Sequence, residues 1–326
     1  MAASAHPFDM SAAHRRVRTT TPLVQCITNT VVQQFTANVL LATGASPAML
    51  DHEADAAQFA GLANGILVNY GTATSHQFLG AEAAIGVANH IGTPWVLDPV
   101  SVGAVDYRTS RIRAAAERRP TAVRGNASEV AALAGMGLGG RGVDSTDSVE
   151  AVLPAAALLS ARTGGVVAVS GEVDAIVLAR PGAGSSGTGA SGTGNGTTAE
   201  AAPTEATVVR VAGGSALMPL VIGTGCSLGG VVAAYLGAAK AAGQVLREGA
   251  SAEGSGVLQA PGTATDAALE AVVAAHAHFA AAGARAGERA QAPGSFAVAF
   301  LDALYEVTDE DLAGVGISAT TVGVPA

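Results

Sequence analysis

The segment Val221–Gly230, VIGTGCSLGG, combines an anion-binding pattern with a cysteine. We expect an apolar strand that ends near Val221, a turn in which Gly223 and Gly225 flank a threonine, and a helix that begins at about Cys226. Backbone N–H groups at such a turn, together with the helix dipole, favour a bound anion such as a phosphate. The same field is expected to lower the pKa of the Cys226 thiol. The alternative is a plain helix start with a buried cysteine.

Two further segments carry carboxylates directly after apolar runs. Asp98 ends the run WVLD and is followed by Pro99, which cannot continue sheet pairing. A carboxylate at that edge can hold Mg²⁺ through water, as phosphoryl transfer requires. In AVRGNASE (122–129), Arg124 could hold a phosphate and Glu129 could share the metal with Asp98. Alternatively, Asn126 and Glu129 form only a capping box at a helix start.

Three other positions lie where a strand is expected to end. Ser170, in VAVSGEVD, could contact a nucleotide or simply form a turn. Asn29, in ITNTVVQQFTAN, could line a pocket or cap a helix. Met49, in GASPAM, follows a strand and would otherwise be a core residue.

Some combinations of reactive residues are discounted. His276 and His278 are two residues apart on an expected helix and therefore do not face one ligand. The run DHEAD (51–55) is interpreted as a solvated helix start. A thiol hydrolase built on Cys226 and a distant histidine has no local signature.

The elements that position these residues alternate along the chain. Runs of strand length, apolar throughout as in a parallel sheet covered on both faces, occupy Leu23–Ile27, Ile66–Asn69, Pro94–Leu97, Thr121–Val123 and Val166–Val169. Ala-rich stretches of helical length occupy Ser75–His90, Arg108–Arg118 and Ser148–Arg162. This pattern predicts an α/β fold whose ligands bind at the carboxyl ends of the strands.

We expect one domain over residues 1–326, with an N-terminal tail at 1–19 and two insertions. Residues 181–206 are rich in Gly, Ser and Thr and have almost no large apolar side chain, so this stretch is predicted to be disordered. It would join two antiparallel strands, Asp174–Ala179 and Thr207–Val211. Residues 248–264 form a second, loose Gly- and Ser-rich insertion.

Composition and charge limit the class of protein. The formal charge is 17 − 26 = −9, and this modest acidic balance, spread thinly, argues against a nucleic-acid surface, which would need clustered Lys and Arg. Two cysteines 200 positions apart are no disulfide framework. The uncharged run over 211–239 is better explained as a strand, turn and helix than as a membrane span. With no signal-like N-terminus, we expect a cytoplasmic protein without membrane contacts, and a mean hydropathy of +0.38 suggests an oligomer.

Taken in order, these segments resemble the hydroxyethylthiazole kinase family of the ribokinase-like superfamily. The resemblance rests on PLVQCITNTVVQQFTANVLLATGASPAM, VLDPVSVGA, RGNASEVAALAG, VSGEVD and GTGCSLGGVVAAYLGA. It runs from about residue 20 to 243 and resumes at Gly294–Leu304.

The resemblance implies a three-layer αβα fold with a mostly parallel sheet, and ATP- and Mg²⁺-dependent phosphorylation of the alcohol of 4-methyl-5-(2-hydroxyethyl)thiazole in thiamine biosynthesis or salvage. It also implies a homotrimer with active sites at subunit interfaces. Matched residue by residue, the resemblance assigns substrate binding to Met49 and Gly223, with Asn29 lining the pocket. It assigns ATP binding to Arg124 and Ser170, and the metal to Asp98 and Glu129. It assigns catalysis to Cys226, which stands where most ribokinase-like kinases carry an aspartate base.

The sequence departs from the family pattern at three positions near the site. Ser101 and Val102 stand where the family usually has glycine and alanine, and Ser170 stands in place of threonine. Alternative functions are a hydroxymethylpyrimidine kinase, a nicotinamide-nucleotide-hydrate dehydratase and a non-catalytic nucleotide-binding protein. The first two are disfavoured by Cys226 in place of aspartate.

Overall fold

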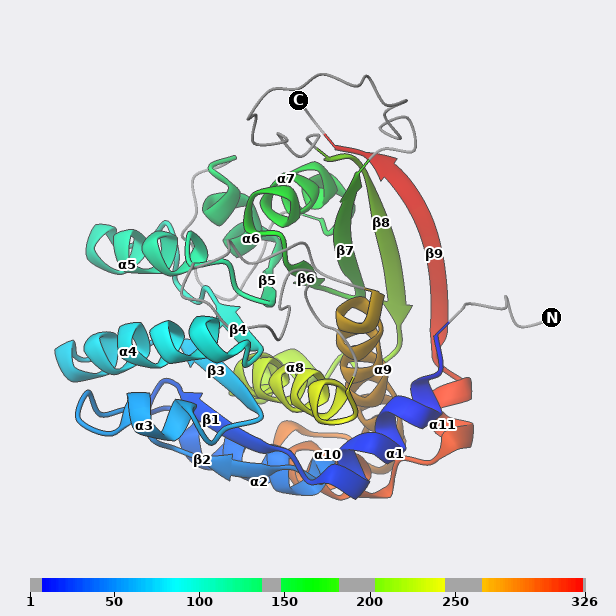
Figure 1. Cartoon of the computed structure of the whole chain (residues 1–326). Coiled ribbons are helices and arrows are strands. Elements are labelled where there is room, and N and C mark those ends of the chain that lie inside the picture. Colours follow the sequence, from blue (N-terminus) through cyan, green and yellow to red (C-terminus); the bar gives the residue numbers. More distant parts are fainter. Residues whose placement is uncertain (1–7, 137–147, 182–202, 244–265, 325–326) are drawn as a thin grey trace.

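The computed structural model describes residues 8–136, 148–181, 203–243 and 266–324. Their strands form one sheet of order β2-β1-β3-β4-β5-β6-β7-β8-β9, shown in Figure 1. The strands are β1 (Leu23–Ile27), β2 (Ser46–Ala48), β3 (Gly65–Asn69), β4 (Trp95–Asp98), β5 (Ala122–Asn126), β6 (Val166–Ser170), β7 (Val173–Pro181), β8 (Pro203–Ala212) and β9 (Gly316–Gly323). The helices are α1 (Met10–Thr20), α2 (Gln33–Thr43), α3 (Ala56–Ala60), α4 (Ser75–Ile91), α5 (Asp106–Ala116), α6 (Ala127–Ala134), α7 (Leu153–Thr163), α8 (Thr224–Ala241), α9 (Asp266–Arg289), α10 (Pro293–Glu306) and α11 (Asp309–Ala313), with 3₁₀ turns η1 (Glu150–Val152) and η2 (Met218–Leu220).

The strands from β2 to β6 pair in parallel. The apolar runs that predicted β1, β3, β4, β5 and β6 are almost entirely buried, whereas the short edge strand β2 is half-buried. Their register sets polar side chains level with one another at the carboxyl edge. Asn69 at the end of β3 pairs with Asp98 at the end of β4, and Asn126 pairs with Ser170. The expectation that Asp98 and Ser170 lie at strand ends is therefore confirmed.

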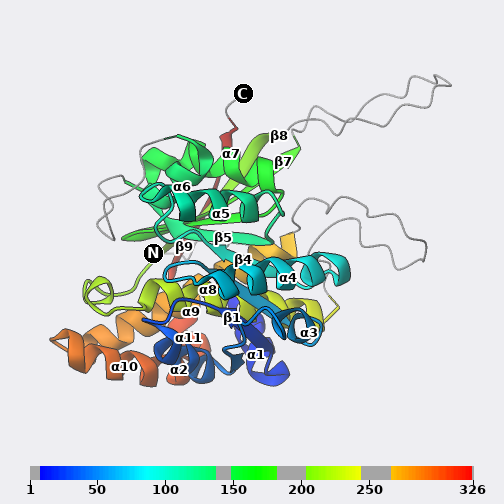
Figure 2. The same cartoon turned by 90° about the vertical axis from the view of Figure 1, so that its left-hand side faces the viewer.

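Helices cover both faces of the sheet and enclose two separate cores. One core lies between the sheet and α1, α2, α8, α9 and α10, and the other lies between the sheet and α3 to α7. Figure 2 shows the arrangement from the side, with α5, α6 and α7 gathered at one end and α2 and α10 at the other. The predicted three-layer αβα class is confirmed.

The far side of the sheet is antiparallel. The predicted strands at 174–179 and 207–211 are present as β7 and β8, which are longer and pair with each other, and β9 completes the edge. The disorder predicted for 181–206 is wrong at both ends, because residue 181 ends β7 and residues 203–206 belong to β8. Residues 182–202 lie outside the described part of the chain. The whole of the second insertion, 248–264, also lies outside it.

Helix α8 lies close to the sheet because a small residue recurs every four positions along one side of it, at Gly229, Ala233 and Gly237. A Cβ on Gly229 would lie 2.9 Å from Leu67 Cδ1, and a Cβ on Gly65 of β3 would lie 2.2 Å from the Ala233 carbonyl oxygen. A Cβ on Gly237 would lie 2.9 Å from the backbone of Asn64. Glycine is required where two backbones approach this closely. This packing sets where the first turn of α8 lies.

Two expectations about element positions are wrong. Residues 1–19 are not only a tail, because Met10, Ala13 and Val17 of α1 are buried in the core. No strand precedes Gly223, since β8 ends at Ala212 and the chain continues through η2. Pro219 and a series of glycines in this stretch favour the turn over a strand.

One described helix, α9, is long and apolar enough to cross a membrane. In the fold, 78% of its most apolar window is buried, as in the core helix of a globular protein. The uncharged run at 211–239 is divided among the end of β8, the loop that contains η2, and most of α8.

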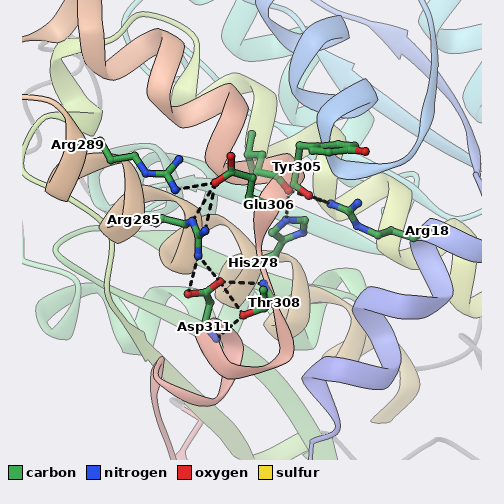
Figure 3. A network of polar contacts seen from close by, with 9 residues as sticks. Arg18, His278, Arg285, Arg289, Tyr305, Glu306, Thr308 and Asp311 are labelled. Carbon is green, nitrogen blue, oxygen red and sulfur yellow. Dashed lines mark hydrogen bonds and ion pairs between the residues drawn. The ribbon is translucent and has the colours of Figure 1, made fainter.

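A polar network ties the C-terminal helices to α1 and α9 (Figure 3). Arg285 bonds both Glu306 and Asp311, while Arg18 of α1 donates to the carbonyl oxygens of Leu304 and Tyr305. At its centre, His278 is fully buried and its Nε2 and Nδ1 lie 2.9 Å from the Leu304 carbonyl oxygen and the Tyr235 hydroxyl, respectively. The histidine is thus a bridge inside the fold and not a ligand.

Burial lowers the pKa of His278 to about 3, and burial with the neighbouring Arg18 charge lowers the pKa of His14 to about 4. Both rings contact each other edge to face at 4.7 Å between centroids. The folded state therefore holds both rings neutral at pH values where the unfolded chain protonates them. Their contribution to stability is complete above pH 6.5 and is lost as the pH falls toward 4.

We predict that His278→Gln flattens the acid side of the stability curve. In the parent protein, His278 alone should lower the free energy of unfolding by about 1.4 kcal/mol per pH unit between roughly pH 6 and 4.5. The glutamine keeps a donor for the Leu304 carbonyl and carries no titrating group. Urea unfolding at pH 8, 6, 5 and 4.5 compares the two proteins, and equal slopes below pH 6 would contradict the prediction.

Candidate active site

The candidate site lies where the carboxyl ends of β1, β3, β4, β5 and β6 meet the first turn of α8. Helix α8 packs against β1, β3 and β4. Its N-terminus thus comes close to residues that are far apart in sequence. The arrangement joins five of the segments singled out by sequence into one place.

The N-terminus of α8 offers unpaired backbone donors. Gly223 is the N-cap residue with φ 97°, a left-handed conformation that favours glycine, and no side chain caps the helix. A Cβ on Gly223 would also lie 3.0 Å from Phe35 and 3.1 Å from Val32. In the described part of the chain, the N–H groups of Gly225 and Cys226 have no hydrogen-bond partner. This turn fits the predicted anion site.

Arg124 faces this turn from β5. Its Nε and Nη2 donate to the Ser170 hydroxyl at 3.1 and 2.7 Å, which joins both predicted nucleotide residues. Its Nη1 lies 3.1 Å from the position of a Cβ on Gly225, so the guanidinium lies against the first turn of α8. Only 8% of Arg124 is exposed. A buried cation beside a helix N-terminus is strongly suited to an anion.

Asp98 is the buried carboxylate of the site. Its pKa is raised to about 7, chiefly by burial and also by the negative charge of Glu129, against the lowering effects of Arg124 and a hydrogen bond from Asn69. Since loss of solvation disfavours the charged form, a cation near this carboxylate would be strongly favoured.

Glu129 also forms the capping box that was the alternative interpretation. Its Oε2 accepts from the Asn126 N–H at 2.9 Å, and the Asn126 side chain accepts from the Glu129 N–H. A Cβ on Gly125 would lie 3.2 Å from both Glu129 Oε2 and Pro99 Cγ, so the missing side chain lets the carboxylate approach the Asp98–Pro99 turn. Capping and proximity to Asp98 therefore coexist.

The expected thiolate at Cys226 is wrong. Burial is the largest influence and raises the thiol pKa to about 11, and the Asp98 charge raises it as well. Arg124 and hydrogen bonds from Asn29 and Asn69 lower it by less. The helix N-terminus is present as predicted, but the enclosed position outweighs it, so the thiol is neutral near pH 7.

Asn69 is a site residue that the sequence analysis missed. It is 2% exposed, donates to Asp98 Oδ2 at 2.9 Å and accepts from Asn29 Nδ2 at 3.1 Å. Asn29 in turn lies 3.5 Å from Cys226 Sγ. The signal was available, because Asn69 ends the apolar run ILVN just as Asp98 ends WVLD.

The predicted substrate residues occupy different parts of this region. Gly223 lies in the site, beside Val32 and Phe35 of the segment that enters α2. Met49 follows β2, an edge strand, and is half-buried against the same core.

The discounted residues lie elsewhere. His276 Nδ1 lies 2.6 Å from Asp174 Oδ2, whereas His278 faces Tyr235 and Leu304, so they do not share a ligand. Asp174 also accepts from the Gly171 N–H at 2.9 Å, which ties the turn after Ser170 to α9. Within the described ranges, no group of three His, Cys, Asp or Glu side chains could hold a metal ion.

Comparison with known proteins gives a consistent result. The model of the "Hydroxyethylthiazole kinase family" matches residues 14–252. A hydroxyethylthiazole kinase of Corynebacterium glutamicum is 50% identical over 299 residues, covering 92% of this chain and 94% of the relative. One of Citrobacter koseri is 42% identical over 302 residues, covering 92% and 95%.

Solved structures extend the likeness to three dimensions. A hydroxyethylthiazole kinase of Pyrococcus horikoshii superposes with a TM-score of 0.69 at 28% identity and covers 97% of this chain and 99% of that one. A pyridoxal kinase of Staphylococcus aureus, solved with AMP-PCP and pyridoxal, has a TM-score of 0.51 at 13% identity, covering 92% and 98%. The latter likeness concerns the fold alone.

Proposed function

The chain belongs to the hydroxyethylthiazole kinase family, and from that premise we infer that it transfers the γ-phosphoryl group of ATP to the alcohol of 4-methyl-5-(2-hydroxyethyl)thiazole in thiamine metabolism. One structural observation supports this activity most directly. The uncapped first turn of α8 lies against a buried arginine and near a buried carboxylate, at the carboxyl edge of the sheet.

The nucleotide side of the site is assigned to Arg124 and Ser170. The Nη1 of Arg124 has no hydrogen-bond partner among the residues that the structure describes, and it lies beside the free N–H groups of Gly225 and Cys226. These donors suit the terminal phosphates of ATP. Ser170 orients the guanidinium through its hydroxyl and borders the nucleotide at the β6–β7 turn.

Asp98 and Glu129 are assigned to Mg²⁺. Within the described residues, no third His, Cys, Asp or Glu side chain joins them. Two carboxylates fit this ion, because Mg²⁺ usually binds through one or two carboxylates, water and substrate phosphates. Bound there, Mg²⁺ would neutralise charge on the phosphate oxygens. The raised pKa of Asp98, caused by burial and by Glu129, fits a carboxylate pair that binds a cation.

The alcohol side is assigned to Met49, Gly223 and Asn29. Gly223 exposes backbone where any other side chain would meet Val32 and Phe35. Asn29 lies within 3.5 Å of Cys226 and so borders the same turn. Met49 supplies an apolar surface at the end of β2 for the thiazole ring.

The reaction forms a bond between the hydroxyl oxygen and the γ-phosphorus, breaks the bond to the bridging oxygen of ADP, and releases the hydroxyl proton. Such a transfer depends mainly on positioning and charge stabilisation. Arg124 and the amides of α8 provide that stabilisation. A neutral Cys226 orients the alcohol and contributes a modest factor, because burial keeps its pKa near 11.

A homotrimer with active sites at subunit interfaces fits the surface beside Gly223. Apolar residues are exposed on neighbouring segments: Val31 before α2, Leu220 and Ile222 around η2, and Val298 on α10. Helix α10 contacts both α2 and η2, so these segments adjoin. Exposed apolar side chains gathered in this way are typical of an interface. We assign a second copy of this chain to it, because the patch continues into the substrate site.

The enzyme is further proposed to be soluble and cytoplasmic, with small-molecule substrates and no nucleic-acid or membrane partner. The acidic net charge of −9 supports this assignment.

We predict ADP release that depends on hydroxyethylthiazole. The purified protein is assayed with ATP and Mg²⁺, with hydroxymethylpyrimidine as the parallel substrate. Turnover with the thiazole alone is expected, and omission of Mg²⁺ should reduce it to background. A preference for the pyrimidine would indicate the other kinase. Binding of ATP without turnover of either alcohol would point to a nucleotide-binding protein or a dehydratase.

Cys226→Ser should lower kcat by less than about tenfold, because a neutral thiol gives no general-base advantage over a hydroxyl of similar position. Positioned general bases typically contribute about 10²–10⁴-fold. The measurement is kcat together with KM for ATP and for the alcohol. A loss of about a thousandfold with both KM values unchanged would show that Cys226 acts as the base.

Ile222→Glu should convert the trimer to monomers, because it places a charge at a residue that is 71% exposed and sits in the apolar patch. Leu62→Glu is the matched control, since Leu62 is 67% exposed but lies before β3, at the amino ends of the parallel strands and not at their carboxyl ends. Light scattering of the three proteins gives the mass. A monomeric parent protein, or a trimer that tolerates Ile222→Glu, would contradict the interface.

A further inference from the structure

Asn69 joins four groups of the site through one side-chain amide. Its Oδ1 accepts from the Gly71 N–H at 2.9 Å and from Asn29 Nδ2 at 3.1 Å, while its Nδ2 donates to Asp98 Oδ2 at 2.9 Å. The residue is almost fully buried at the end of β3. None of the roles assigned above uses it.

The surroundings permit only one orientation of this amide. The Gly71 N–H can only donate and therefore requires an oxygen opposite it. The Asp98 carboxylate, when charged, can only accept and therefore requires an N–H. Rotating the Asn69 amide by half a turn would place N–H against N–H and oxygen against carboxylate. Each unsatisfied buried group would cost about 1–3 kcal/mol, so the rotated state is excluded.

The fixed orientation of the Asn69 amide also determines the orientation of the Asn29 amide. Since Asn69 Oδ1 needs a donor, Asn29 must present its Nδ2, and the same nitrogen lies 3.5 Å from Cys226 Sγ. Both N–H groups of Asn29 are thereby used. Its Oδ1 has no hydrogen-bond partner in the described ranges, and it is not among the unpartnered polar atoms that are sealed from solvent. It is thus an acceptor left open beside the first turn of α8.

We propose that Asn69 is a positioning residue for the phosphoryl transfer: it holds the Asn29 amide so that Asn29 Oδ1 accepts a hydrogen bond from the substrate hydroxyl. This inference rests on the proposed function. An alcohol O–H is the donor that this oxygen lacks, and the bond directs a lone pair of the hydroxyl oxygen toward the phosphate held by α8 and Arg124. Alignment of the attacking atom is the main demand of this chemistry.

Gly71 packs closely against the hydrogen-bonded pair of Asn29 and Asn69. A Cβ there would lie 3.0 Å from Asn29 Cβ, 3.1 Å from Asn69 Oδ1 and 3.1 Å from Val100 Cγ1. The Thr30 N–H donates to Thr72 Oγ1 and the two threonine hydroxyls bond each other, so the loops after β1 and β3 are also joined next to the amide pair. Asn29 is therefore held by its backbone as well as by its side chain.

Two substitutions at position 69 separate the effect of the Asn69 side-chain oxygen from the effect of its N–H donor. Asn69→Asp keeps an oxygen for the Gly71 N–H and for Asn29 Nδ2 but loses the donor to Asp98. Asn69→Leu loses both. We expect Asn69→Leu to raise KM for the alcohol about tenfold with KM for ATP within about twofold. Asn69→Asp should leave KM for the alcohol within about threefold, whatever its effect on kcat through Asp98.

A double-mutant cycle tests whether Asn69 acts through Asn29. Asn29→Leu removes the acceptor itself and Asn29→Asp retains one. In the Asn29→Leu background, adding Asn69→Leu should not raise KM for the alcohol further, because the oxygen that it orients is gone. Effects on that KM that multiply would overturn the proposal. So would equal alcohol KM values for Asn69→Asp and Asn69→Leu.

Thermal unfolding of each variant checks the fold, and Asn69→Ser, smaller and without a distal acceptor, replaces the leucine variant if that one does not fold. The parent protein separates the two levels of inference. If it does not phosphorylate the thiazole, the proposed function fails. If it does and the Asn69 variants behave alike, only the positioning role fails.

Discussion

The close approach of α8 to the sheet is the constraint on which the site depends. Gly229 leaves room for Leu67, and Gly65 leaves room for the carbonyl of Ala233, so helix and strands meet backbone to backbone. A larger residue at either position would lift the helix by the width of a side chain. Its first turn would then no longer lie against Arg124, and the free amides and the guanidinium could not share one phosphate. Packing and chemistry thus depend on the same glycines.

The electrostatic balance of the site explains why a cysteine is acceptable at position 226. Asp98 and Glu129 already place two carboxylates nearby, and the second raises the pKa of the first. An aspartate at 226 would add a third negative charge to an enclosed space that must accept a phosphate. A thiol with a pKa of about 11 adds none and leaves Arg124 and the helix N-terminus unopposed. The site therefore favours anion binding over base strength, which agrees with the limited need for a base in phosphoryl transfer.

Most of the fold could be predicted from the sequence because the parallel strands are continuous apolar runs with a polar residue at the end. Asp98, Arg124 and Ser170 were found by this rule, and Asn69 would have been found had the rule been applied to ILVN. The rule failed before Gly223, where an apolar stretch interrupted by Pro219 is a 3₁₀ turn and not a strand. The protonation state of Cys226 could not be predicted, because the helix dipole is visible in a sequence pattern whereas the degree of enclosure is not.

Ser101 shows how the fold tolerates a departure from the family pattern next to Asp98. It adopts φ 68°, a left-handed conformation that costs a non-glycine residue about 1–2 kcal/mol. The turn is held by hydrogen bonds from the Val102 N–H to the Pro99 carbonyl and from the Gly103 N–H to Thr109. Val102 is also buried, and that burial is of the right size to offset the strain. The serine therefore takes the backbone conformation that a glycine would adopt most easily. Because the backbone after Asp98 is held in this way, the carboxylate stays level with Asn69, and the amide chain that reaches Asn29 keeps its orientation.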